Sequence, residues 1–208
     1  MTGSLGTWDR FPAWSPDGSY IAFASSQGGD GNCDIRAISS TGQVTRLTAD
    51  PANDIAPAWS PDGNRVAFVS DRLSSDANYR SNLYVMSLGG SDATCLTCGR
   101  LLVGGQEAEQ VRSCTWSPDG THIVFDTVGF IYVIDSGGGE PLRVADYFEE
   151  PREYGGFGWP RWSPAGDRIA MTCTLRNQGN RHICLMNPDG SSLPRLPNGW
   201  PDYLGCPA

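Results

Sequence analysis

Few side chains in this sequence could carry out general acid–base or metal chemistry. It has two histidines, His122 and His182, and each begins an expected strand, HIVF and HICL. A zinc or manganese site built on either would need two or three further ligands at suitable spacing, and no such run is present. The Gly-x-Ser-x-Gly turn that presents the nucleophile of an α/β-hydrolase is also missing. We therefore expect no catalytic residue, no metal ion and no cofactor.

Seven cysteines are the other reactive side chains. A high cysteine content is typical of oxidising compartments, and an odd number leaves at least one thiol without an intramolecular partner. Cys95-x-x-Cys98 ends an expected strand, with no helix to lower a thiolate pKa and no second Cys-x-x-Cys to complete a zinc site. A local disulfide and two unrelated thiols are both compatible with this spacing.

A repeated pentapeptide indicates the elements that position these residues. Trp-Ser-Pro-Asp-Gly occurs at Trp14–Gly18, Trp59–Gly63 and Trp116–Gly120, and as Trp-Ser-Pro-Ala-Gly at Trp162–Gly166. After each motif come an apolar run, a loop, a second run, and a short segment that follows a Gly-containing turn. The runs are short, rich in Val and Ile and bounded by turn-forming residues, which indicates β-strands. Each repeat therefore contains four strands, and the Ser-Pro-Asp-Gly turn joins the first to the second.

Four-stranded repeats of about 45 residues are typical of β-propeller blades, which cannot bury their faces alone. We predict an all-β fold, a single propeller of four antiparallel blades that forms either a closed ring or a partial propeller. The blades span about residues 9–50, 54–98, 111–147 and 157–197, with a fourth strand after Leu193 and a tail at 198–208. The motif tryptophans are expected in the core. If the ring stays open, the outer faces of blades 1 and 4 expose an apolar surface for another chain to cover.

The fourth blade contains a second possible disulfide, between Cys173 and Cys184. In the third blade a tight turn places Phe125 opposite Tyr132, and the same register places Met171 opposite Cys184. Cys173 is then diagonal to Cys184, which is close but not ideal for a bridge unless a bulge brings the two opposite each other. A disulfide and two free thiols both remain open.

The repeat resembles the TolB-like β-propeller repeat, in which W-S-P-D-G is followed by I-A-F, D-I-Y-V-M and R-L-T. The resemblance extends from about Asp9 to Leu196. This family includes the periplasmic TolB protein of bacteria and the propeller domains of prolyl-oligopeptidase-type peptidases. TolB propellers close with six blades, whereas four repeats are present here. Asp17, Asp62 and Asp119 match the acid of the motif, and we interpret them as turn residues.

The residues that begin the innermost strands are expected at the mouth of the central channel. Asp9 and Asp54 each stand five residues before a motif Trp. Two acids on one rim could hold a cation or a cationic partner group, or could simply cap a loop and face solvent. Arg112 and Arg161 lie on the inward strands of blades 3 and 4 and could neutralise these acids. We expect the four residues to form a binding site.

The charge pattern excludes several classes of partner. The net charge is −8 and all 15 basic residues are arginines, without the clustered basic surface that nucleic acids or anionic lipids require. No apolar run approaches the roughly 18–20 residues that span a bilayer, so we expect no direct membrane insertion. The first residues, MTGSLGTWDRF, do not predict a signal peptide. The cysteine content and the resemblance together favour a periplasmic or extracellular location.

These features favour a non-catalytic module that binds protein partners, as a homo-oligomer or as a subunit of a larger complex. One alternative is the regulatory propeller of a prolyl-oligopeptidase-type peptidase that lacks its catalytic domain. A second alternative is a propeller that binds a small ligand or sugar, with Trp8, Trp159 and Trp200 available to stack on it.

Overall fold

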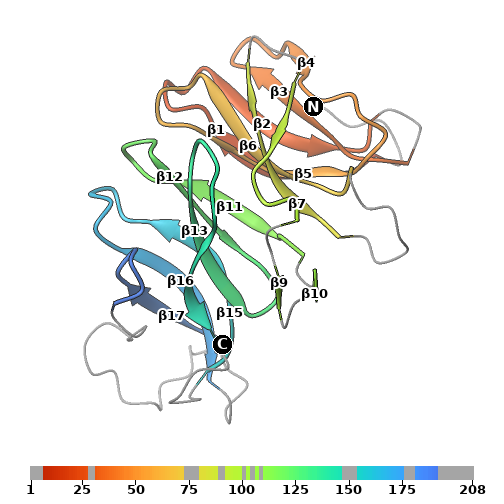
Figure 1. Cartoon of the computed structure of the whole chain (residues 1–208). Coiled ribbons are helices and arrows are strands. Elements are labelled where there is room, and N and C mark those ends of the chain that lie inside the picture. Colours follow the sequence, from red (N-terminus) through yellow and green to blue (C-terminus); the bar gives the residue numbers. More distant parts are fainter. Residues whose placement is uncertain are drawn as a thin grey trace, which may run out of the picture.

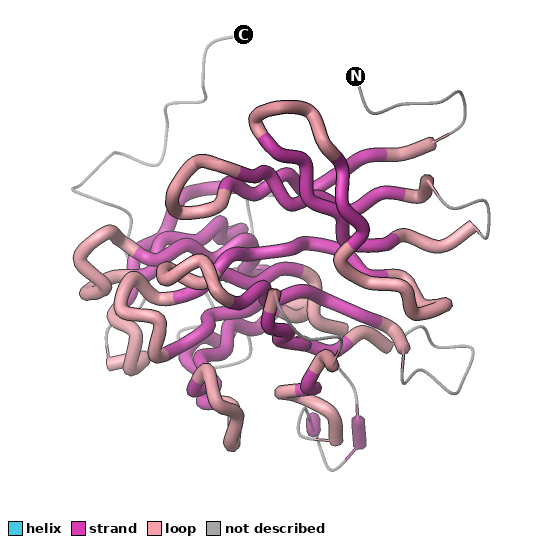
Figure 2. The backbone as a smooth tube through the Cα atoms, turned by 90° about the horizontal axis from the view of Figure 1, so that it is seen from above, coloured by secondary structure: helices cyan, strands magenta, loops and turns pink. Residues whose placement is uncertain are grey.

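Every regular element in the described part of the chain is a β-strand (Figure 1, Figure 2). The computed structural model describes residues 7–27, 31–72, 80–88, 92–99, 102–103, 106–107, 110–146, 154–175 and 181–191. Within these ranges no helix is long and apolar enough to cross a membrane.

The strands form blades in the order in which they occur along the chain. Blade 1 consists of β1 (Asp9–Trp14), β2 (Tyr20–Ser25), β3 (Asp34–Ser39) and β4 (Val44–Arg46). Blade 2 consists of β5 (Asp54–Trp59), β6 (Arg65–Ser70), β7 (Asn82–Ser87) and β8 (Thr94–Cys95). Blade 3 consists of β11 (Ser113–Trp116), β12 (His122–Asp126), β13 (Phe130–Asp135) and β14 (Leu142–Asp146). Blade 4 contains β15 (Tyr154–Trp162), β16 (Ile169–Leu175) and β17 (Arg181–Met186).

The predicted all-β propeller of four blades is confirmed. A small ribbon of β9 (Leu102–Val103) and β10 (Gln106–Glu107) lies between blades 2 and 3 in the sequence. The strand expected after Leu193 and the tail at 198–208 lie outside the described residues.

A network of hydrogen bonds closes the turn of the repeated motif. In blade 3 the Ser117 hydroxyl donates to the Asp119 carboxylate at 2.6 Å and accepts the His122 N–H at 2.9 Å. The Thr121 N–H donates to the same carboxylate at 3.0 Å, and Gly120 has a φ of 72°, which favours glycine. These donors, above all Ser117, lower the pKa of Asp119 to about 2. The motif acids therefore stabilise turns, as the sequence indicated.

Blade 4 replaces the missing acid of its motif by another residue. Ala165 occupies the position of Asp119, and the Ser163 hydroxyl donates instead to Asp167 at 2.7 Å. The Arg168 N–H donates to the Ser163 hydroxyl at 3.1 Å, which is the equivalent of the bond from His122. The turn thus keeps its serine network with the carboxylate two positions later.

The blades pack face to face through three clusters of buried apolar side chains, each between consecutive blades. Blades 1 and 2 share a cluster around Ile35 and Phe68, and blades 2 and 3 share one around Leu83 and Phe125. Blades 3 and 4 share a cluster that includes Ile131, Ile169, Met171 and both Cys173 and Cys184. Most of the hydrophobic core therefore lies between blades, so each blade depends on a neighbour for stability.

The motif tryptophan of one blade packs against the blade before it. Trp59 donates its indole N–H to the Ala13 carbonyl at 3.1 Å, and Trp116 donates to the Ala58 carbonyl at 3.0 Å. In both cases a residue of the preceding blade covers the indole ring, and this residue stands six positions after the motif Trp of its own blade. Tyr20 stacks on Trp59 with centroids 6.5 Å apart, and the Arg65 guanidinium lies 4.5 Å from the centroid of Trp116.

The four blades form an open arc rather than a closed ring (Figure 1). Blade 1, red to orange, and blade 4, blue, lie at opposite ends of the arc, and among the described strands they share no interface comparable to the other three. In the described part of the chain no blade packs on Trp14, which is 66% exposed, whereas Trp116 is 5% exposed. The expectation that all motif tryptophans lie in the core was therefore wrong for Trp14.

Candidate functional site

Three of the four innermost strands bend at the same position. Phe11, Ala56 and Trp159 each stand three residues before a motif Trp and have φ values of 56°, 51° and 56°. Each precedes a proline, which has no N–H for the sheet ladder, and the strand pairing shifts register at each of these sites. At the equivalent positions blade 3 has Ser113, and Cys114 in place of the proline. The register of β11 against β12 does not shift there.

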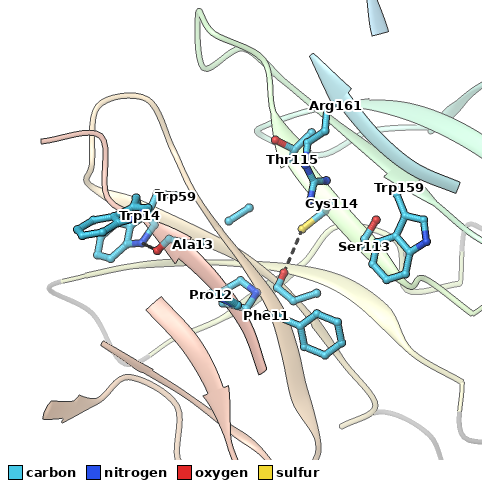
Figure 3. A pocket seen from close by; sticks show the side chains of 13 residues that line it. Phe11, Pro12, Ala13, Trp14, Trp59, Ser113, Cys114, Thr115, Trp159 and Arg161 are labelled. Atoms are coloured by element: carbon cyan, nitrogen blue, oxygen red, sulfur yellow. Dashed lines mark hydrogen bonds between the residues drawn. The ribbon is translucent and has the colours of Figure 1, made fainter. Parts of the chain in front are cut away.

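The bends surround a pocket of about 310 Å³ on the inner side of the arc (Figure 3). All four innermost strands contribute to its wall. They supply Phe11, Pro12, Ala13 and Trp14; Ala56, Pro57, Ala58 and Trp59; Ser113, Cys114 and Thr115; and Trp159 and Arg161. We call this cavity the axial pocket. Among the features of the described structure, the axial pocket is the one to which all four blades contribute residues.

Trp159 is the most exposed of the three bend residues, because Phe11 is half-buried and Ala56 is buried. It is 45% exposed, and its left-handed backbone is an outlier for a bulky side chain. Holding a residue in such a conformation costs about 1–3 kcal/mol, and strained residues concentrate at functional sites. The fold therefore maintains an exposed indole on the pocket wall at an energetic cost.

Arg161 supplies a positive charge to the axial pocket. Its Nη1 donates to the Pro160 carbonyl at 2.8 Å, and in the described part of the chain no carboxylate forms an ion pair with it. The Cys114 thiol lies on β11, the innermost strand of blade 3, and contacts the Ala56 carbonyl at 3.7 Å. Burial raises the pKa of Cys114 to about 12, so this thiol is neutral and a poor nucleophile at ordinary pH.

Of the four residues expected at the channel mouth, only Arg161 lines the axial pocket. Asp54 is fully buried, and Arg72 binds both of its oxygens at 3.0 Å. Burial raises the pKa of Asp54, and hydrogen bonds from Ser70 and Thr48 oppose that effect. Asp9 is exposed at the start of β1.

Arg112 binds a different carboxylate from the two that were expected. It forms an ion pair with Asp126 at 2.8 Å, and the Ser113 hydroxyl donates to the other oxygen of Asp126 at 2.5 Å. Asp126 is buried at the end of β12, in the apolar run IVFD, where nothing in the sequence marked it. An acid at the end of one strand, beside a strand that begins with Ser113 directly after Arg112, is the signal that could have found it.

The two histidines lie outside the axial pocket. His122 interacts through Nδ1 with the Thr121 hydroxyl at 2.7 Å, and Nε2 of His182 is buried with no hydrogen-bond partner among the described residues. Among the described residues, no group of three or more His, Cys, Asp or Glu side chains could hold a metal ion.

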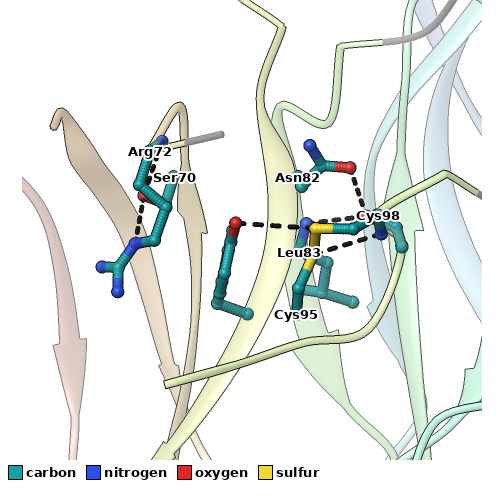
Figure 4. The surroundings of a disulfide bond; sticks show 8 residues. Ser70, Arg72, Asn82, Leu83, Cys95 and Cys98 are labelled. Carbon is teal, nitrogen blue, oxygen red and sulfur yellow. Dashed lines mark hydrogen bonds between the residues drawn. A yellow bond between two sulfur atoms is a disulfide. The ribbon is translucent and has the colours of Figure 1, made fainter. Parts of the chain in front are cut away.

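Both candidate cysteine pairs form disulfides. Cys95 and Cys98 have Cα atoms 5.8 Å apart, and the Tyr84 hydroxyl lies 3.5 Å from the Cys98 sulfur (Figure 4). Cys173 and Cys184 are bridged across a diagonal, because Met171 pairs with Cys184 and no bulge interrupts β16 and β17.

The remaining cysteines form no bridge in the described structure. Cys33 and Cys114 are free thiols, and Cys206 lies outside the described residues. The Cys-x-x-Cys motif is therefore a local crosslink here, and neither of its sulfurs is available as a thiolate.

The family comparison agrees with this architecture. Residues 3–127 match the TolB beta propeller domain. The chain belongs to the TolB β-propeller family. Among curated proteins, no sequence is significantly similar to it.

Solved structures show the same fold. TolB from Agrobacterium tumefaciens is 22% identical with a TM-score of 0.70, and the match covers 88% of this chain and 63% of that one. TolB from Acinetobacter baumannii is 20% identical with a TM-score of 0.65, and the match covers 90% of this chain and 42% of that one. A puromycin hydrolase is 18% identical with a TM-score of 0.62, covering 93% of this chain and 31% of the enzyme. The chain therefore spans less than two thirds of the length of these TolB structures.

Proposed function

We propose that this TolB-like chain is a non-catalytic module that binds a protein partner at the axial pocket, outside the cytoplasm. One observation carries the proposal: Trp159 and Arg161 lie on the same strand at the pocket, one exposed and the other without a carboxylate partner among the described residues. Tryptophan and arginine are the residue types that most often dominate the binding free energy of protein interfaces. Two disulfides support an oxidising location.

The chemistry around the pocket supports a role without turnover. The Ser113 hydroxyl donates to Asp126, and Arg112 forms an ion pair with the same carboxylate. The Cys114 thiol is neutral, as described above. These groups are already engaged in the interactions that hold the blade together.

A small ligand is the second candidate for the same pocket. Small-molecule sites have volumes of roughly 300–1,000 Å³ and combine an apolar wall with a few polar groups. The axial pocket, at about 310 Å³, has the indole of Trp159, the side chains of Ser113 and Thr115, and the charge of Arg161. An organic anion with a flat apolar group would suit these walls.

Site-directed crosslinking tests the proposal. A photo-crosslinking amino acid at position 115 lies in the pocket wall, and one at the exposed position 128 serves as a control. We expect a discrete protein adduct from position 115 and none from position 128, and loss of the adduct in Trp159→Ala and Arg161→Gln. Arg168→Gln, an exposed arginine outside the pocket, should retain it.

Two results would contradict the proposal. A ligand screen in which small anions shift the Trp159 indole resonance, with no protein adduct from position 115, would favour the small-ligand function. Peptidase, esterase or lyase turnover that a single point mutation abolishes would show that the module is an enzyme.

A further inference from the structure

The two disulfides differ in how well solvent can reach them. Cys173 and Cys184 are both 0% exposed, and they lie in the buried cluster between blades 3 and 4. Cys95 and Cys98 are half-buried at the outer edge of blade 2, where β8 pairs only with β7. A disulfide is opened by a thiolate that reaches one of its sulfurs, and exposed bridges are the labile ones. Access therefore favours exchange at Cys95–Cys98.

The two bridges also close loops of different length. Cys95 and Cys98 are separated by 3 residues, and Cys173 and Cys184 by 11 residues. A shorter loop removes less conformational entropy from the unfolded chain, so folding favours the shorter bridge less strongly over its two free thiols. The fold thus protects Cys95–Cys98 less against reduction than it protects Cys173–Cys184.

Blade 1 forms the turn of this bridge without any crosslink. Residues 46–49 of blade 1 read Arg-Leu-Thr-Ala, where residues 95–98 of blade 2 read Cys-Leu-Thr-Cys. The Leu47 N–H donates to the Ile35 carbonyl at 2.8 Å, and the Ile35 N–H donates to the Thr48 hydroxyl at 2.9 Å. These two hydrogen bonds tie the turn of blade 1 to β3.

The crosslinked turn of blade 2 has the same two hydrogen bonds. The Leu96 N–H donates to the Leu83 carbonyl at 2.8 Å, and the Leu83 N–H donates to the Thr97 hydroxyl at 3.0 Å. Because the equivalent turn forms in blade 1 without cysteines, the disulfide is not required for this local structure. The turn of blade 2 should therefore survive the loss of its crosslink.

Hydrogen-bond donors lie beside both sulfurs of the bridge. The Cys98 N–H donates to the Cys95 sulfur at 3.1 Å, and the Tyr84 hydroxyl lies 3.5 Å from the Cys98 sulfur (Figure 4). Hydrogen bonds to the charged form favour a thiolate over its thiol. A sulfur that leaves as a thiolate is therefore stabilised at this site.

We propose that the Cys95–Cys98 disulfide is a reversible redox site, which an external dithiol opens without unfolding the propeller. One thiolate of the dithiol attacks the Cys98 sulfur, the Cys95–Cys98 bond breaks, and Cys95 leaves as a thiolate that the Cys98 N–H stabilises. The second thiolate of the dithiol attacks the mixed disulfide and releases Cys98. Two electrons pass to the cysteine pair, the two protons of the dithiol end on the two cysteines, and the reductant becomes a disulfide.

Reduction acts on a turn that contacts two of the buried clusters. Leu96 is 3% exposed and belongs to the cluster between blades 2 and 3, and both cysteines of the bridge pack on the cluster between blades 1 and 2. Without the crosslink, hydrogen bonds and packing alone hold the turn, so local opening becomes more frequent. The redox state thus sets how often the outer edge of blade 2 opens.

Differential alkylation with mass spectrometry measures how fast dithiothreitol reduces each disulfide. In the folded chain we expect Cys95–Cys98 to be reduced roughly ten times faster than Cys173–Cys184, with an unchanged circular dichroism spectrum. In the urea-unfolded chain the two rates should be similar, which controls for intrinsic reactivity. Equal rates in the folded chain would overturn the proposal. So would reduction of Cys95–Cys98 that proceeds only as the folded spectrum is lost.

A double variant separates a redox site from a structural bridge. Cys95→Ser, Cys98→Ala removes the bond and should fold with the wild-type spectrum, because blade 1 forms this turn without cysteines. By hydrogen exchange, the Leu96 amide should exchange faster in this variant and in the reduced wild-type chain than in the oxidised chain. The equivalent Leu47 amide of blade 1 should be unchanged, as the matched control.

Two results of this second experiment would contradict the proposal. A double variant that does not fold would show that the bridge is structural. A Leu96 amide that exchanges equally in the oxidised and reduced chains would show that the redox state has no effect on the turn. None of these measurements depends on the axial pocket or its partner.

Discussion

Replacing Trp116 by Ala should destabilise the protein far more than the same replacement at Trp14, although both residues begin the same motif. Trp116 is 5% exposed, its indole N–H donates to the Ala58 carbonyl at 3.0 Å, and Arg65 lies 4.5 Å from its ring centroid. Truncating a buried Trp costs about 3–5 kcal/mol. The Ala58 carbonyl also loses its partner and Arg65 its aromatic contact, so we expect a value at the upper end, about 4–5 kcal/mol.

The same change at Trp14 removes none of these contacts within one chain. Exposed side chains outside special features typically cost less than about 1 kcal/mol when replaced. Urea unfolding followed by circular dichroism gives both values from the transition midpoints, provided that the slopes agree with wild type. Losses of equal size would show that the motif Trp stabilises its own blade. They would refute the conclusion that its contribution to the free energy of unfolding comes from packing on the preceding blade.

The remaining predictions concern a turn and a crosslink. The Asp119 carboxyl should titrate near 2 by NMR, and Ser117→Ala should move its pKa toward the ordinary value of 3.8 because the strongest donor is lost. Since folding lowers this pKa, the stability that the turn acid contributes is present above pH 4 or so and is lost as the pH falls toward 2; an unchanged pKa in Ser117→Ala would contradict this account. The double variant Cys173→Ser, Cys184→Ser should unfold with about 3 kcal/mol less stability, given the sequence separation of 11 residues. Thermal unfolding measures it, and an unchanged midpoint would mean that the bridge adds no stability.

The fold was predictable because the same local chemistry recurs in every blade. A Ser-Pro-Asp-Gly turn between two apolar runs leaves little choice of strand pairing, and the tight hairpin of blade 3 fixed the register for blade 4. That register placed Met171 opposite Cys184, as observed. What it could not decide was whether the diagonal Cys173 would be bridged, because this depends on small movements of the two strands.

The candidate site was harder to predict because ion pairs depend on three-dimensional neighbours. Arg112 was expected to be able to neutralise the rim acids Asp9 and Asp54. Instead, Asp54 and Arg112 each bind a residue of their own blade, Arg72 and Asp126. Arg72 follows β6 and Asp126 ends β12, so both pairs span two adjacent strands. The sequence showed which blades carry charge, whereas strand twist and side-chain direction selected the partners.

The exposure of Trp14 was missed for a related reason. A motif residue is buried by the blade before it, so its environment depends on the arrangement of the whole arc rather than on its own repeat. The same motif therefore gives an interior residue at Trp116 and an exposed one at Trp14.

The open arc also has a consequence for how the molecule fluctuates. Blades 2 and 3 each contribute to two of the three buried clusters, whereas blades 1 and 4 each contribute to one. In a linear array with nearest-neighbour coupling, an end unit can detach after losing a single interface, but an inner unit must lose two. The amide protons of β6 and β12 should therefore exchange with solvent most slowly, and those of β3 and β17 should exchange through partial opening of one end. Fraying from both ends thus leaves blades 2 and 3 as the last folded pair, and the axial pocket, which needs all four blades, is the first feature to be lost.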